Sequence, residues 1–228
     1  MDVFGQALSD FYYGRPGEIL WLHNSYGETE EMPVDVFFRT EEEMPELELL
    51  ALDYCKGKIL DIGAGAGSHA LLLQERNARV TALELSPGAC DVMKERGVRN
   101  ILQKDIFDFR EGSFDTLLML MNGIGLSGTS AGLRHFLKHI KKLLAPGGRL
   151  LCDSSDISYL YEDSPMPEDK YFGEVQYQYE FKNIKGPVFK WLYVDWRTFA
   201  EIAEEEGYFF RLLHEDGQDQ YLAMLELK

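Results

Sequence analysis

Short apolar runs and helix-period stretches take turns along the middle of the chain. The apolar runs predict strands at 59–62, 79–83, 100–103, 114–121 and 149–152. The segments between them carry helical spacing and helix-ending glycines. Strands that alternate with helices predict an α/β fold with a doubly wound parallel sheet.

The pattern differs before residue 57. Apolar pairs at helical spacing predict a short amphipathic helix over 3–12, and a second helix is expected to begin near Pro45. The segment 21–27, rich in aromatic and hydrogen-bonding side chains, is expected to be irregular. We therefore expect an N-terminal helical cap.

The pattern changes again after residue 157. Strict alternation over 174–181, a break at 182–187 and a second apolar run over 188–194 predict an inserted antiparallel hairpin. A helix from Asp195 to Glu206 and a terminal strand pair follow. The prediction is a single domain of 1–228, divided into a cap (1–56), a core (57–157), a loop and hairpin (158–194) and a C-terminal helix and strand pair (195–228).

A glycine-rich turn joins the first predicted strand to its helix. Gly63, Gly65 and Gly67 follow the strand, and a helix begins at once. Glycines admit positive φ and close ligand approach, and a helix start presents unpaired N–H groups. Asp61 precedes the turn, where its charge suits a cationic ligand group such as an ammonium better than a pyrophosphate. The turn therefore predicts a nucleotide-like ligand with a cationic group.

Composition narrows the class of partner. The 228 residues include 23 basic and 39 acidic side chains, a formal charge of −16, which disfavours a nucleic-acid substrate. No apolar stretch reaches bilayer length, so no membrane span is expected. Three scattered cysteines and an N-terminus without signal-peptide character favour a cytoplasmic protein with reduced thiols.

Further motifs sharpen the prediction. Glu84 ends the second strand nineteen residues after Gly65, the spacing of a ribose-binding acid in doubly wound folds. Asp105 follows the third strand, and Leu-Ala-Pro-Gly-Gly at 144–148 precedes the fifth. With the Asp-Ile-Gly-Ala-Gly-Ala-Gly motif at 61–67, this ordered set resembles the class I S-adenosylmethionine-dependent methyltransferases.

The resemblance implies a Rossmann-like seven-stranded sheet and S-adenosylmethionine as cofactor, with S-adenosylhomocysteine as product and no metal. Asp105 is then expected to meet the adenine amine and Ile106 to pack on its ring. The full set of implied cofactor-binding residues is Asp61, Gly63, Ala64, Gly65, Gly67, Glu84, Leu85, Asp105, Ile106, Met121 and Asn122.

The acceptor is less defined. Methyltransferases acting on planar amino groups often carry Asn/Asp-Pro-Pro-aromatic after strand four, whereas this chain has Asn122 followed by glycine. A small-molecule acceptor is favoured, with oxygen, nitrogen, sulfur and carbon all open. His23 and Asp153 are the predicted general bases, should a proton have to leave. Substrate-pocket candidates are Tyr12, Tyr13, Arg39 and Asp156.

Alternatives remain open at this stage. The aromatic side chains of the predicted hairpin could wall a pocket, form a homodimer interface or pack against the N-terminal segment. A non-catalytic cofactor-binding or interaction protein would share the same motifs. An NAD(P)-dependent oxidoreductase would share the fold, although Asp61 and the Gly-x-Gly-x-Gly spacing count against it.

Overall fold

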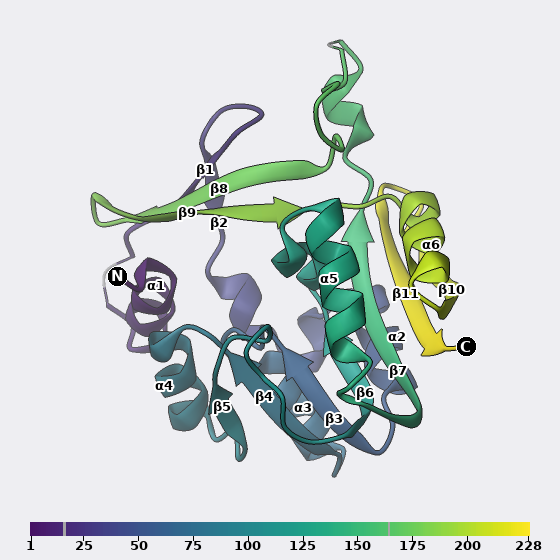
Figure 1. The fold of residues 1–228 in the computed structure, drawn as a ribbon. Coiled ribbons are helices and arrows are strands. Elements are labelled where there is room, and N and C mark those ends of the chain that lie inside the picture. The colour runs from purple at the N-terminus through teal and green to yellow at the C-terminus, as the bar shows by residue number, and fades with distance from the viewer. Residues whose placement is uncertain (16, 164) are drawn as a thin grey trace. The chain divides into compact units, whose positions relative to one another are not determined.

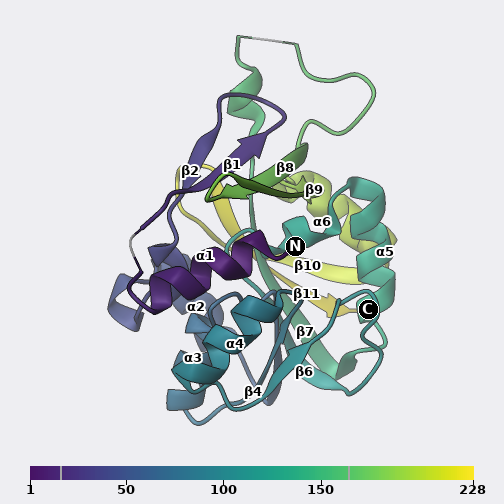
Figure 2. The same ribbon diagram turned by 90° about the vertical axis from the view of Figure 1, so that its left-hand side faces the viewer.

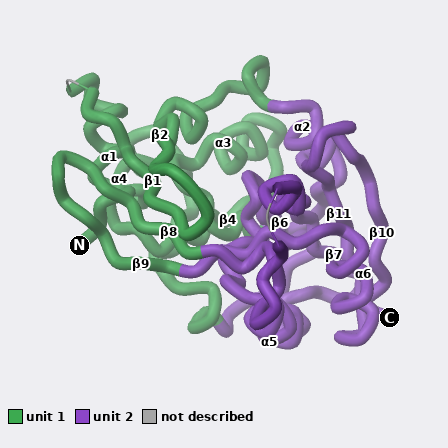
Figure 3. Tube along the Cα trace, turned by 90° about the horizontal axis from the view of Figure 1, so that it is seen from above, with its two compact units in different colours: residues 1–44, 60–109, 176–189 green, residues 45–59, 110–175, 190–228 purple. Residues whose placement is uncertain are grey.

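A computed structural model describes residues 1–15, 17–163 and 165–228, so position 164 of the predicted loop lies outside the described residues. The chain forms two compact units (Figure 3). The first unit comprises residues 1–44, 60–109 and 176–189, and the second comprises 45–59, 110–175 and 190–228.

A seven-stranded sheet has the strand order β10-β11-β7-β6-β3-β4-β5 (Figure 1). β4 pairs with β5 and β6 with β7 in parallel, whereas β11 runs antiparallel to both β7 and β10. This mixed sheet confirms the predicted α/β class. Its strands are β3 (Lys58–Ile62), β4 (Arg79–Glu84), β5 (Ile101–Gln103), β6 (Phe114–Met119), β7 (Leu144–Ser155), β10 (Tyr208–Glu215) and β11 (Gln220–Leu227).

The helices of the first unit begin where the sequence provides caps. Asp2 accepts from the Gly5 amide at the start of α1, and Ser86 caps α4, which ends at the left-handed Gly97. Leu8 of α1 packs with Ala89 and other buried residues around the glycine turn. These helices are α1 (Val3–Tyr12), η1 (Asp35–Phe38), η2 (Glu41–Glu43), α3 (Ser68–Glu75) and α4 (Pro87–Arg96).

A second, antiparallel sheet has the order β2-β1-β8-β9. The expectation of an irregular segment at 21–27 is wrong, because Leu20–Asn24 forms β1 between β2 (Glu30–Met32) and β8 (Glu174–Phe181). The cap is therefore not wholly helical. The predicted hairpin is present, and its second strand, β9, spans Ile184–Leu192. Its turn is shorter than expected, because Lys182 and Asn183 both adopt positive φ, as two-residue hairpin loops require.

This pairing bears on the three roles considered for the hairpin. β8 bonds to β1, and the ring of Tyr179 stacks on Phe4 of α1 with centroids 5.6 Å apart. The hairpin therefore packs against the N-terminal segment within the first unit. A role in dimerisation stays a prediction.

The second unit contains the other helices. The sequence predicts a helix over 129–144, but α5 ends at Ile140, because Leu144 already begins β7 and pairs with Phe114. Asp195 caps α6 as expected, accepting from the Thr198 amide. The helices are α2 (Glu46–Tyr54), η3 (Gly123–Ser127), α5 (Ser130–Ile140), η4 (Ser158–Tyr161) and α6 (Trp196–Glu205). Within the described ranges, no helix has the length and apolarity needed to cross a membrane.

Candidate cofactor site

The glycine turn between β3 and α3 has the backbone that its sequence requires. Gly63, Gly65 and Gly67 have φ of 74°, 55° and 86°, a region that side chains rarely adopt. A Cβ on Gly67 would lie 2.8 Å from Val98 and 2.9 Å from Met93. Buried Ala64 lies within the turn, and its amide donates to Leu83 at the end of β4. Only glycine fits position 67 without rearrangement.

Asp61 lies on β3 just before this turn and is 2% exposed. Its Oδ2 atom has no hydrogen-bond partner among the described residues. Burial raises the pKa of Asp61 to about 6, and the nearby His69 opposes that rise. A buried carboxylate oxygen without a donor is costly, and it fits a cationic group arriving from outside the chain.

Glu84 ends the adjacent strand, β4, and its carboxylate accepts hydrogen bonds from three backbone amides. Oε2 accepts from the Gly65 amide at 2.9 Å, while Oε1 accepts from the amides of Leu85 and Ser86 at 2.8 and 2.9 Å. Burial raises the pKa of Glu84, and the three amide donors oppose that rise. A carboxylate offers about four acceptor sites. A carboxylate at a strand end could accept from both ribose hydroxyls, but here one acceptor site remains, on Oε2, and it suits a single hydroxyl.

Three further residues predicted to bind the cofactor, two of them at the adenine, follow β4 and β5. The Leu85 side chain is 63% exposed, next to the buried Glu84. Asp105 is half-buried, and its Oδ1 accepts from the Phe107 amide at 2.9 Å. Ile106 is buried. The predicted contacts with Asp61, Glu84, Leu85, Asp105 and Ile106 thus all fall in the first unit.

Met121 and Asn122 lie in the second unit, directly after β6. Both are left-handed, with φ of 61° and 57°, although neither is glycine. Consecutive non-glycine residues in this region are strained, and such strain concentrates at functional sites. The Asn122 side-chain oxygen accepts from the Ser155 hydroxyl at 2.9 Å at the end of β7.

The other predicted residues of the second unit have structural partners. Asp153 is fully buried on β7, and its Oδ2 accepts from the Gln220 amide group at 2.9 Å. Asp156 follows β7 and caps a turn, with its Oδ1 accepting from the Ser158 amide. Neither contact tests a role in catalysis or substrate binding.

His23 lies on β1, and its ring contacts polar groups on both sides. Nε2 is 2.7 Å from Glu180, and Nδ1 is 2.9 Å from the Thr29 hydroxyl. In the register of β1 with β8, His23 lies opposite Gln178, and the buried Leu22 lies opposite Tyr179. Because side chains alternate across a strand, His23 lies on the sheet face opposite Leu22.

The remaining pocket candidates lie near the end of α1 and after η1. Tyr12 and Tyr13 pack edge to face with ring centroids 5.1 Å apart, and both are exposed. Arg39 donates from Nε to the Val36 carbonyl at 2.9 Å. All three lie in the first unit, together with the glycine turn.

Two residues at the turn were not expected from the sequence. Phe37 of η1 lies 3.4 Å from the position that a Cβ on Gly65 would take. Arg96 donates to the Ala66 carbonyl at 2.7 Å and to the Phe37 carbonyl at 3.4 Å. No local pattern signals this contact, because Phe37 precedes the glycine turn by some thirty residues in an unremarkable aromatic pair.

Known proteins match this chain over the region that contains the glycine turn. The family described as "Methyltransferase domain" matches residues 60–152. A solved S-adenosylmethionine-dependent methyltransferase from Bacteroides fragilis, in complex with S-adenosyl-L-homocysteine, is 40% identical. The match covers 99% of this chain and 94% of that one, with a TM-score of 0.91.

Curated relatives match over a shorter region. A cypemycin N-terminal methyltransferase from Streptomyces sp is 28% identical over 102 residues, and a demethylmenaquinone methyltransferase from Tropheryma whipplei (strain Twist) is 32% identical over 104. Each match covers 43% of this chain and 42% of the relative, so the chain spans less than half the length of either. Together with the glycine turn and its two buried carboxylates, the match to the Bacteroides enzyme shows that the chain belongs to the class I S-adenosylmethionine-dependent methyltransferases.

Proposed function

We propose that this protein transfers the methyl group of S-adenosylmethionine to a small-molecule acceptor, with 1–228 acting as one functional domain. The observation that carries the proposal is the buried Asp61 oxygen, which finds no donor in the described part of the chain and lies beside a turn of left-handed glycines. A cofactor with an amino-acid ammonium supplies the donor that this oxygen lacks. A dinucleotide would instead bring its negative pyrophosphate to this carboxylate.

Each part of the cofactor has a proposed partner. Asp61 receives the ammonium, and the free acceptor site on Glu84 receives a ribose hydroxyl. Asp105 accepts from the adenine amine, with Ile106 and the exposed Leu85 packing on the ring. Gly63, Ala64, Gly65 and Gly67 let the backbone approach the cofactor, and Met121 and Asn122 are proposed to lie near the transferred methyl.

The cofactor supplies a methyl group already activated by a positively charged sulfur. The residues of the chain hold the reactants in alignment, which can contribute about 7–11 kcal/mol to rate acceleration. His23 and Asp153 remain the proposed general bases, needed only when the acceptor must lose a proton. Tyr12, Tyr13, Arg39 and Asp156 are the proposed contacts to the acceptor.

The charge and the sequence after β6 narrow the class of acceptor. Of the curated relatives named above, one is an N-terminal methyltransferase of cypemycin and the other a demethylmenaquinone methyltransferase, so their names point to different acceptors. The charge of −16 disfavours a nucleic acid, and glycine in place of Pro-Pro after Asn122 disfavours a planar amino group. These features support a small, uncharged or cationic molecule.

Ligand-dependent stabilisation tests the cofactor assignment. A ligand at 100 times its dissociation constant stabilises the folded state by about 2.7 kcal/mol, or roughly 5–10 °C in Tm for a chain of this size. We expect this shift with S-adenosylhomocysteine and none with NAD or NADP. A shift with NAD alone would overturn the proposal. Transfer of labelled methyl to fractionated small molecules would then identify the acceptor.

Location and assembly are also proposed. The three free cysteines, Cys55, Cys90 and Cys152, suit a reducing cytoplasm. A homodimer through the hairpin is supported by the exposed side chains of Ile184 and Val188 on β9, a strand at the sheet edge. A molar mass in solution near 26.2 kDa would exclude the dimer.

A further inference from the structure

Asp2 joins two helix starts in the first unit. Its Oδ1 accepts from the Gly5 amide at 2.9 Å, which caps α1. Its Oδ2 accepts from the Ser86 hydroxyl at 2.7 Å and from the Gly88 amide at 2.9 Å, both at the start of α4. A carboxylate is favoured at a helix N-terminus, and this one is shared by two.

α1 and α4 lie side by side (Figure 2). They can meet this closely because each has a glycine at the contact. A Cβ on Gly88 would lie 2.8 Å from the backbone of Gly5, and a Cβ on Gly5 would lie 2.2 Å from the Asp2 carboxylate. These distances are too short for a side chain. The absence of a side chain at both positions therefore allows Asp2 to reach the loop after β4.

That loop carries the ribose-binding carboxylate of the proposed function. The Ser86 hydroxyl bonds to Asp2, while the Ser86 backbone amide donates to Glu84 Oε1 at 2.9 Å. The same hydroxyl accepts from the Ala89 amide, which fixes its direction. A continuous path of hydrogen bonds therefore runs from Asp2 through Ser86 to Glu84.

We infer that Asp2 is a positioning residue for cofactor binding, acting through Ser86 to hold the Glu84 carboxylate in the direction that accepts a ribose hydroxyl. The inference rests on the proposed role of Glu84. α1 itself contributes no proposed cofactor-binding residue. Its docking against α4 is nevertheless coupled to the affinity for the cofactor. By reciprocity, bound cofactor strengthens the attachment of α1.

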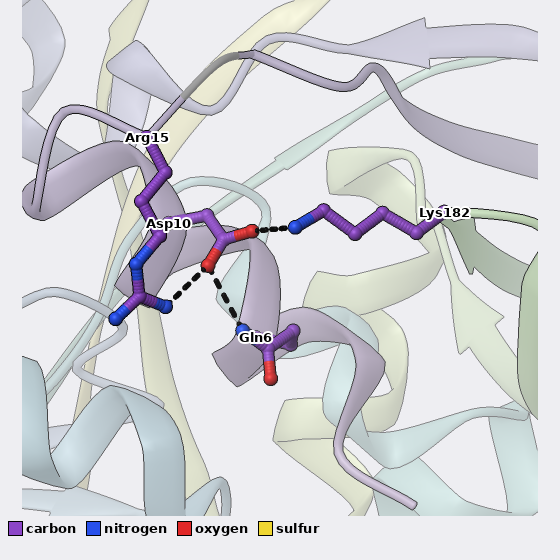
Figure 4. A network of polar contacts seen from close by, with 4 residues as sticks. All are labelled: Gln6, Asp10, Arg15 and Lys182. Atoms are coloured by element: carbon purple, nitrogen blue, oxygen red, sulfur yellow. Dashed lines mark hydrogen bonds and ion pairs between the residues drawn. The ribbon is translucent and has the colours of Figure 1, made fainter.

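Asp10 provides a matched control on the same helix. This buried carboxylate bonds to Gln6, Arg15 and Lys182 and so attaches the other end of α1 to the hairpin turn (Figure 4). Its removal should loosen α1 at least as much as removal of Asp2. Among the described residues, Gln6, Arg15 and Lys182 make no hydrogen bond or ion pair to the Glu84 loop. A general loss of helix docking can therefore be separated from a loss of positioning.

The experiment is calorimetric titration of the full chain with S-adenosylhomocysteine, with unfolding measured for every variant. We expect Asp2→Ala to weaken binding about tenfold in the wild-type background and less than twofold in the Glu84→Gln background. Asp10→Ala should weaken binding less than twofold despite an equal or larger loss of stability. Asp2→Asn, which keeps an acceptor oxygen, should lose less affinity than Asp2→Ala and serves if the alanine variant does not fold.

Two results would overturn the inference. Equal losses for Asp2→Ala and Asp10→Ala would show that only helix docking matters. A full tenfold effect of Asp2→Ala in the Glu84→Gln background would show that Asp2 does not act through Glu84. If Glu84→Gln alone leaves affinity unchanged, the proposed cofactor site itself fails, and that outcome is distinct from both.

Discussion

A buried carboxylate lies near the end of each of β3 and β4, but the two differ in the hydrogen bonds that they accept from the protein. Glu84 already accepts from three backbone amides, whereas Asp61 has an oxygen to which no described residue donates. The first is fixed by the protein before any ligand arrives. The second has lost its hydration without gaining a hydrogen bond, and a ligand that donates to it would offset that desolvation free energy. The difference fits the proposed function, in which Asp61 binds the ammonium of the cofactor and Glu84 binds a ribose hydroxyl.

Removing Glu84 should have the largest effect. Glu84→Ala leaves the amides of Gly65, Leu85 and Ser86 without their acceptor and removes the proposed ribose contact. A charged hydrogen bond contributes about 1.5–3 kcal/mol, so we expect S-adenosylhomocysteine affinity to fall about 50-fold by calorimetry. Unfolding in urea should also show a loss of stability. Unchanged affinity would remove Glu84 from the site.

Removing the charge of Asp61 should separate the two carboxylates most clearly. Asp61→Asn should weaken S-adenosylhomocysteine binding about 20-fold, yet raise the free energy of unfolding of the ligand-free protein at pH 7 by about 2 kcal/mol, because a buried charge is lost. Thermal unfolding without ligand shows whether the substitution raises or lowers the stability of the protein. A loss of stability as large as that of Glu84→Ala would contradict the difference between them.

The pH dependence should follow Asp61. Since its pKa is raised to about 6, the carboxylate is protonated below that value and cannot pair with an ammonium. Affinity for S-adenosylhomocysteine should therefore rise roughly tenfold from pH 5 to pH 7. In the ligand-free protein the sign is opposite, and stability falls as pH rises from about 4 to 6. A flat affinity profile in the wild type, like that expected for Asp61→Asn, would refute the assignment.

The smallest effect is expected from Arg96, which contacts the turn but neither carboxylate. Arg96→Met removes its bonds to the Ala66 and Phe37 carbonyls while keeping most of the side-chain volume. We expect about a threefold loss of S-adenosylhomocysteine affinity, measured by calorimetry. A loss as large as that of Glu84→Ala would mean that the turn backbone, and not the carboxylates, dominates binding.

Local sequence patterns were enough to predict the glycine turn, the position of Glu84 and the alternation of strands and helices. The glycines at 63, 65 and 67 and the spacing to Glu84 follow from strand, turn and helix periodicity within about twenty-five residues. The predicted alternation of strands and helices is confirmed by the sheet order. Ser86 before Pro87 and Asp195 before its helix are also local cap signals in the sequence, and both side chains cap their helices.

What could not be predicted depends on contacts between distant segments. β1 pairs with β8, about 150 residues later, and this pairing turned a segment expected to be irregular into a strand. The bonds from Asp2 to Ser86 and Gly88, and the contact of Phe37 with Gly65, also join separate stretches. Hydrophobic periodicity contains no information on such partners.

The most direct test compares two ligands on one variant. Methylthioadenosine keeps the nucleoside of S-adenosylhomocysteine but lacks its amino-acid group, so Asp61 has nothing to bind in it. We predict by calorimetry that Asp61→Asn lowers affinity for S-adenosylhomocysteine about 20-fold and leaves that for methylthioadenosine within twofold of wild type. Equal losses for the two ligands would contradict the claim that Asp61 receives the ammonium of the cofactor.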